Sequence, residues 1–82
     1  MTGEKEQLRL LGLAIRSVRE TRGSTIAGLA RAAGISAEQL QAVEAGELDP
    51  DYELLVRLAE CLNTRPSAFV VRAEELGGRQ DG

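Results

Sequence analysis

The segment TIAGLARAAGISAEQLQAVEAG, residues 25–46, contains two short helical patterns separated by Gly34. In the first pattern, apolar side chains recur every three or four residues until Gly34, which lacks a Cβ and can adopt the left-handed backbone that ends a helix. Ser36 is a typical N-cap for the second pattern, and Gln39 is placed to complete a capping box. Leu40 and Val43 form the apolar stripe of this second helix, and Gly46 ends it. The segment therefore predicts two helices joined by a tight turn.

Two helices of this length, joined by a turn of about three to four residues that includes a glycine, are typical of a helix-turn-helix. In that motif the second helix is the one that contacts base edges. We therefore expect the helix that follows Ser36, at about residues 37–45, to be the reading helix.

The rest of the chain predicts three more helices. Residues 4–22 carry an apolar stripe, which ends before Gly23. We expect a helix at residues 52–62, with Asp51 as its N-cap. We expect a further helix to begin at Pro66, because the first residue of a helix needs no backbone N–H. Thr25 is the expected N-cap of the helix that contains Gly28. The inward positions of the first helix are Leu8, Leu11, Ile15 and Val18. Those of the helix at residues 52–62 are Leu54, Leu55, Leu58, Ala59 and Leu62.

Length and composition limit the class of protein. The chain has 82 residues, 43% of them hydrophobic, and its aromatic residues are Tyr52 and Phe69, so we expect one small domain with an aliphatic core. Residues 1–76 would form this domain, and residues 77–82 a frayed tail. No histidine is present, which argues against a metal site and against acid–base catalysis by histidine. We expect a cytoplasmic protein without membrane segment, cofactor or enzymatic activity.

The charge distribution is uneven. The net charge is −3, yet residues 1–23 carry five basic and three acidic side chains. Residues 24–56 carry only Arg31 against six acidic side chains. This acidic excess lies on and just after the expected reading helix, where contact with phosphates favours the opposite sign.

The sequence from about Leu11 to Phe69 resembles the phage-repressor and Cro-like (XRE) helix-turn-helix family. The resemblance implies an all-α, compact five-helix bundle, a lambda-repressor-like DNA-binding domain. The residues that carry it are Leu11-Gly12, Ile15-Arg16, Arg19, Gly23, Leu29-Ala30, Ala33-Gly34-Ile35-Ser36, Leu40, Val43-Glu44, Gly46, Pro50, Leu54, Leu58-Ala59 and Leu62.

The resemblance also implies roles for individual residues. Arg19 and Glu44 correspond to a buried or half-buried ion pair between the first and third helices. Gln41 could pair with adenine and Glu38 could accept a hydrogen bond from cytosine. The chain departs from the family at Ile26, usually a phosphate-binding Gln, and at Ala45, often a basic or amide residue. The expected DNA-contacting residues are Arg16, Thr25, Ser36, Ala37, Glu38, Gln41 and Ala42.

Several residues keep two interpretations. Arg16 could contact a phosphate or be a solvated surface residue. Glu38 could read cytosine or simply complement the helix dipole. We expect Cys61 to be a buried, inert thiol rather than a redox sensor, because nothing cationic near it in the sequence would lower its pKa. The apolar residues of the last helix could close the core or form a two-fold interface; they are Phe69, Val70 and Leu76.

We expect a sequence-specific transcription regulator that binds double-stranded DNA as a homodimer. The alternative is a helix-turn-helix domain that has become a protein-interaction module, an accessory or antitoxin-like subunit with weak or no DNA binding. The acidic block of residues 24–56 and the departures at Ile26, Ala42 and Ala45 favour this alternative, and an exposed Ile26 could belong to its apolar patch. An enzyme is a distant third, because the carboxylates have no visible activating neighbour.

Overall fold

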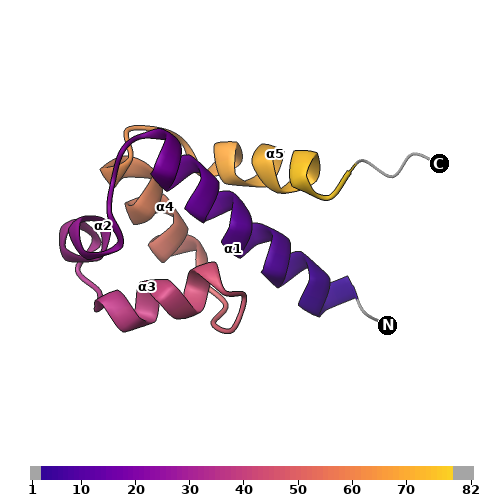
Figure 1. The fold of residues 1–82 in the computed structure, drawn as a ribbon, viewed down its shortest axis with the longest axis horizontal. Helices are drawn as coiled ribbons and strands as arrows, with labels where there is room; N and C mark the ends of the chain where they lie inside the picture. Colours follow the sequence, from indigo (N-terminus) through magenta and orange to yellow (C-terminus); the bar gives the residue numbers. More distant parts are fainter. Residues whose placement is uncertain (1–2, 79–82) are drawn as a thin grey trace.

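The computed structural model describes residues 3–78 as five helices, with no strand within this range (Figure 1). The prediction of an all-α, five-helix, lambda-repressor-like fold is confirmed. The predicted ranges 4–22, 37–45 and 52–62 and the predicted start at Pro66 agree with the observed helices to within one residue. The helices are α1 (Gly3–Thr21), α2 (Ile26–Ala33), α3 (Ala37–Glu44), α4 (Tyr52–Cys61) and α5 (Pro66–Leu76).

Helix α1 is the longest element and the centre of the arrangement. It packs against α5 on one side and against α3 on the other, while α2 contacts α3 and α4. In Figure 1, α5 runs beside the upper half of α1 and the two helices then diverge toward the chain ends. Helices α2, α3 and α4 form a compact group on the other side of α1. Within this group, α3 lies at the lower edge of the molecule in Figure 1.

The core is aliphatic with a single aromatic ring, as the composition predicts. Ile15, Leu29, Leu40 and Leu58 are buried almost completely, and Phe69 has no exposed surface. Every helix therefore contributes a large side chain to one common cluster. Leu11, Ile26, Ile35, Leu54 and Leu55 are partly buried and pack against it.

Local signals account for the helix ends. The side chains of Thr25, Ser36 and Asp51 each accept a hydrogen bond from the backbone N–H three residues later, which satisfies one free donor at each N-terminus. At C-termini the chain turns through left-handed residues, Gly34 with φ of 78° and Asn63 with φ of 59°. Pro66 is the first residue of α5.

Cys61 is exposed, so the prediction of a buried thiol is wrong: the last turn of α4 directs Leu58, Ala59 and Leu62 into the core instead. Of the predicted tail, Gly77 and Gly78 continue from α5 as a turn, and residues 79–82 lie outside the described residues. Among the helices described, none combines the length and the apolar character that a membrane span requires.

Candidate nucleic-acid interface

The turn between α2 and α3 is held by backbone and side-chain hydrogen bonds. Gly34 adopts the left-handed conformation, and the N–H of Ile35 donates to the carbonyl of Ala30 at 3.0 Å. The N–H of Gln39 donates to Ser36 Oγ at 3.0 Å, and the N–H of Ser36 donates to Gln39 Oε1 at 2.9 Å. Both bonds of the predicted capping box are present, so two backbone N–H groups at the start of α3 are satisfied.

Helix α3 has one buried and one exposed side. Leu40 and Val43 point into the core. Ala37, Glu38 and Gln41 are exposed, and Ala42 is half-buried at the margin. We refer to Ala37, Glu38, Gln41 and Ala42 as the α3 edge. The structure thus brings together four of the residues that the resemblance implied for base contact.

The C-terminal half of α3 is pressed against α1. A Cβ added to Gly12 would lie 2.5 Å from the carbonyl oxygens of Val43 and Glu44, so only glycine permits this approach. Gly46, with φ of 78°, lies equally close to the backbone of α1: a Cβ added to Gly46 would lie 2.8 Å from the Cα of Arg9. These contacts hold α3 at its end and leave its first turns outside.

An ion pair joins the same two helices. Arg19 Nε donates to Glu44 Oε2 at 2.8 Å and Arg19 Nη2 donates to Glu44 Oε1 at 3.1 Å. Arg19 Nη1 also donates to the carbonyl of Ser24 at 2.9 Å, and both side chains are nearly buried. The bidentate hydrogen bonds to Glu44 raise the pKa of Arg19 further above its already high ordinary value, against the opposing effect of burial. Arg19 therefore stays charged at every physiological pH.

The other residues expected to contact DNA are exposed, and their side chains form hydrogen bonds or an ion pair with residues close in sequence. Arg16 Nε forms an ion pair with Glu20 Oε2 at 3.1 Å on the surface of α1. Thr25 Oγ1 accepts from the N–H of Gly28 at 3.0 Å, and Ser36 Oγ caps α3. The hydroxyl and guanidinium groups can keep these bonds while they contact a phosphate, since each retains further donors.

Ile26 is half-buried and packs against the core, so it does not supply the exposed apolar surface considered for the protein-interaction alternative. Arg57 was not singled out from the sequence, yet its Nη1 donates to the carbonyl of Ala33 at 3.3 Å and brings a positive charge to the end of α2. Periodicity cannot identify such a contact, because it arises from the packing of α4 against α2.

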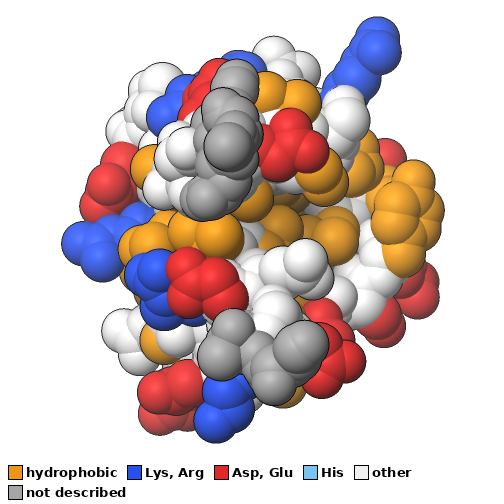
Figure 2. Space-filling model, turned by 90° about the vertical axis from the view of Figure 1, so that its right-hand side faces the viewer, with side chains coloured by type: hydrophobic (Ala, Val, Ile, Leu, Met, Phe, Trp, Pro, Cys, Tyr) orange, Lys and Arg blue, Asp and Glu red, His pale blue; other side chains and the backbone are white. Residues whose placement is uncertain are grey.

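The three residues of α5 that were expected at a two-fold interface differ in their exposure to solvent. Phe69 is fully buried within the protomer and is unavailable to a second copy, so it must be removed from that set. Val70 and Leu76 are 52% and 44% exposed. Hydrophobic side chains are also visible across the middle of the face that carries both chain ends (Figure 2).

The five-helix arrangement, the capped turn and the exposed α3 edge define an all-helical helix-turn-helix domain. A model of the helix-turn-helix family matches residues 15–69, and the chain belongs to this family. Comparison with curated proteins gives no match.

Several solved structures are similar to the chain. The clp gene regulator ClgR from Corynebacterium glutamicum is 28% identical, with a TM-score of 0.85 over 90% of this chain and 96% of that one. A helix-turn-helix transcriptional regulator from Vibrio cholerae is 25% identical, with a TM-score of 0.79; the match covers 89% of this chain and 41% of that one. The restriction-modification controller protein C.AhdI from Aeromonas hydrophila shares the fold, at 24% identity and a TM-score of 0.73 over 76% of this chain and 94% of that one.

Family membership makes this chain a DNA-binding transcription regulator of the XRE type and not an enzyme. Within the described residues, no cluster of three or more metal-binding side chains is found.

Proposed function

We propose that the chain recognises a specific DNA sequence as a homodimer, with the α3 edge of each protomer in the major groove of one half-site. The observation that carries this proposal is the placement of α3. Its end, at Val43 and Glu44, is held against α1 by the close approach of Gly12 and by the Arg19–Glu44 pair. Ala37, Glu38 and Gln41 are exposed. The N-terminal residues of a recognition helix are the ones that reach base edges.

Gln41 and Glu38 are the readers in this proposal. A glutamine amide can pair with adenine N6 and N7 in a bidentate way, and a carboxylate can accept from the N4 amino group of cytosine. Ala37 and Ala42 supply small apolar contacts, which suit a thymine methyl group. Ser36, Thr25 and Arg16 would contact phosphates and set the orientation of α3 without reading sequence.

The acidic block of residues 24–56 shapes the expected binding mode. Glu44 is buried and paired with Arg19, but the other five carboxylates of this block are exposed and repel phosphates, so attraction to random DNA should be weak. We therefore expect binding to depend on base contacts and on two linked half-sites. Two protomers would place their reading helices about 34 Å apart, one turn of duplex.

Selection of bound sequences from a random duplex pool tests this proposal, performed on the wild-type chain and on Gln41→Ala. The variant should lose preference at one position of each half-site, at a cost of about 1 to 3 kcal/mol for the preferred base. Gln39→Ala is the matched control. It removes the same amide from the same helix but from the capping box, so it should leave the base preference unchanged. A preference that changes in Gln39→Ala but not in Gln41→Ala would refute the assignment.

A further inference from the structure

A second surface of the molecule has the opposite charge to the region around α3. A groove of about 720 Å³ lies between the end of α1, the turn that links α4 to α5, and α5 itself. We call it the arginine groove. Arg22, Arg65 and Arg72 line its sides together with Glu75, so it carries a net charge of +2 in a molecule of net charge −3. Val18, Ala68 and Val71 also line the groove and supply its apolar surface.

The three arginines are not equivalent. Arg72 Nη1 donates to Ser17 Oγ at 2.9 Å, and Arg72 Nε pairs with Glu75 Oε1 at 3.1 Å. The guanidinium of Arg72 is therefore already bound within the protein. Arg22 makes a single long bond, from Nη1 to the carbonyl of Asn63 at 3.4 Å. Arg65 is exposed, and its side chain forms no hydrogen bond or ion pair with any other described residue. Arg22 and Arg65 are therefore the groups available to a ligand.

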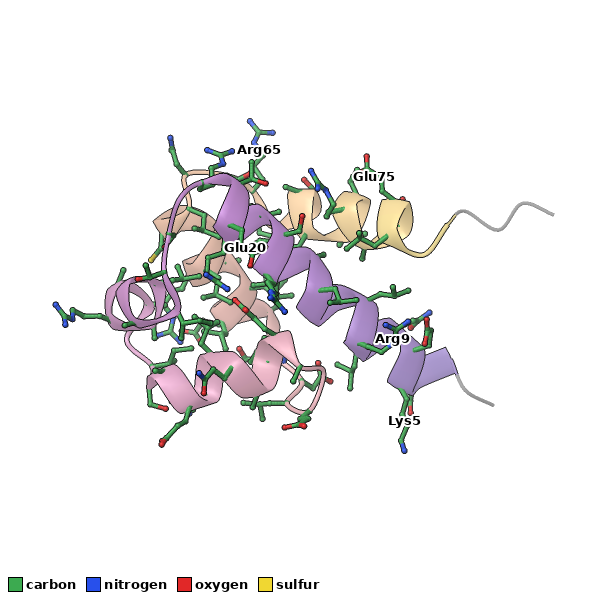
Figure 3. All side chains as sticks on the ribbon, viewed as in Figure 1. Lys5, Arg9, Glu20, Arg65 and Glu75 are labelled. Atoms are coloured by element: carbon green, nitrogen blue, oxygen red, sulfur yellow. The ribbon has the colours of Figure 1, made fainter. Side chains whose placement is uncertain are left out.

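The groove and the α3 edge lie at different ends of the molecule. In Figure 1 the turn between α4 and α5 is at the top and α3 is at the bottom. Figure 3 places Arg65 at that upper turn, with Glu75 further along α5. None of the four residues of the α3 edge lines the arginine groove, so the two surfaces are distinct.

We propose that the arginine groove docks an acidic, partly apolar peptide segment of a partner protein. Guanidinium groups bind carboxylates through paired, charge-assisted hydrogen bonds, and Arg22 and Arg65 line the groove together with the apolar side chain of Val71. Val71 is 52% exposed, and a small apolar side chain between two carboxylates would cover it. The arginines and the exposed Val71 side chain therefore both favour an acidic peptide that also carries small apolar side chains.

The start of α5 is poorly suited to the other anionic ligand, a phosphate group. A helix N-terminus binds phosphate through free backbone N–H groups. Pro66 has no N–H, and the N–H of Ala68 already donates to the carbonyl of Arg65 at 2.9 Å. The positive potential comes from long side chains that can follow an extended peptide.

Fluorescence anisotropy on the full chain tests the proposal, with a labelled synthetic peptide of repeated Asp-Leu-Glu-Ala as the probe. The same peptide with Asn and Gln in place of the acids should bind far less. Arg22→Gln combined with Arg65→Gln should weaken binding of the acidic peptide by about tenfold. Arg31→Gln removes an exposed charge from α2, outside the groove, and should leave the affinity unchanged. Val71→Glu, which adds a carboxylate inside the groove, should also reduce the affinity.

Amide NMR shifts locate the bound probe and decide between outcomes. Shifts confined to the end of α1 and the start of α5, lost in the double variant, support the proposal. Binding that Arg31→Gln weakens as much as the double variant would overturn it, as would shifts centred elsewhere or no binding at low salt. Tripolyphosphate binding to the groove without binding of the peptide would also overturn it.

Discussion

Arg19 and Glu44 are the charged residues on which the position of α3 most depends. Both are nearly buried, and the guanidinium is satisfied by two carboxylate bonds and the carbonyl of Ser24. Loss of one partner leaves a charge in a site with little water, which is more costly than replacement of both partners by apolar groups.

We predict that Glu44→Ala lowers the free energy of unfolding by about 3 kcal/mol or more, whereas Arg19→Met combined with Glu44→Leu costs less than that single change. Urea denaturation measures both. Glu20→Ala is the control, because it breaks an exposed Arg–Glu pair on α1 and should cost less than about 1 kcal/mol. Equal losses in Glu44→Ala and Glu20→Ala would contradict this account of the buried pair.

Glu6 shows the same chemistry at the surface. Arg9 Nη2 donates to Glu6 Oε2 at 2.7 Å, and this hydrogen bond lowers the pKa of Glu6 below its ordinary value of 4.5. A lowered pKa means that the pair contributes stability above pH 4.5 and loses it as the pH falls through the folded-state pKa. Carboxyl NMR titration should show the lowered pKa, and Arg9→Gln should return it toward 4.5. An unchanged pKa in the variant would show that Arg9 is not the cause.

At the scale of helices, the contact between α1 and α3 depends on Gly12. We predict that Gly12→Ala destabilises the fold by about 2 kcal/mol, because the new methyl group would meet two backbone carbonyls that cannot move away. This cost exceeds the gain of about 1 kcal/mol that alanine brings to a helix interior.

Gly28→Ala is the matched control, since its added Cβ would meet only the Thr25 hydroxyl at 3.0 Å, a side chain that can shift. Thermal unfolding should show a loss for Gly12→Ala and a small change or a gain for Gly28→Ala. If Gly12→Ala is as stable as the wild type, α1 and α3 do not approach as closely as described.

Helix boundaries were predictable because each has a local chemical cause. Ser36 with Gln39, Asp51, Asn63 and Pro66 act on their own turns, and periodicity then identifies the inward side chains. The exposure of Cys61 was not predictable in this way. It lies seven residues after Leu54, on the same side of an ideal helix, but the neighbours of α4 cover Leu58, Ala59 and Leu62 instead.

The site was predictable in part for the same reason. The apolar stripe of α3 predicts which side of this helix is exposed, whereas the choice of the α3 edge for base contact came from the family resemblance and stays a prediction. Arg57 at the end of α2 and the arginine groove depend on contacts between segments far apart in sequence: Arg72 meets Ser17, 55 residues away. Their distances in space follow from the packing of whole helices, which no local pattern encodes.

At the scale of the whole molecule, the exposed side chains of Val70 and Leu76 on α5 belong to the proposed homodimer interface. We predict that Val70→Glu combined with Leu76→Glu shifts the chain from dimer to monomer, because the two carboxylates would be buried without partners at a two-fold interface. Sedimentation equilibrium gives the dissociation constant.

Val71→Glu is the control for this prediction. Val71 is as exposed as Val70, at 52%, but lines the arginine groove instead, so this variant should remain dimeric. A wild-type chain that stays monomeric at high concentration, or a Val71→Glu chain that dissociates as readily as the double variant, would contradict the proposed interface.

The affinity for duplex DNA as a function of salt tests most directly whether the α3 edge faces DNA. The account predicts that a duplex selected by the wild-type chain binds at low salt, and that the logarithm of its affinity falls linearly with the logarithm of salt concentration. The slope should be about −0.9 for each phosphate contacted. Absence of binding at low salt, or an affinity that salt does not change, would contradict the account and favour a helix-turn-helix domain that binds proteins alone.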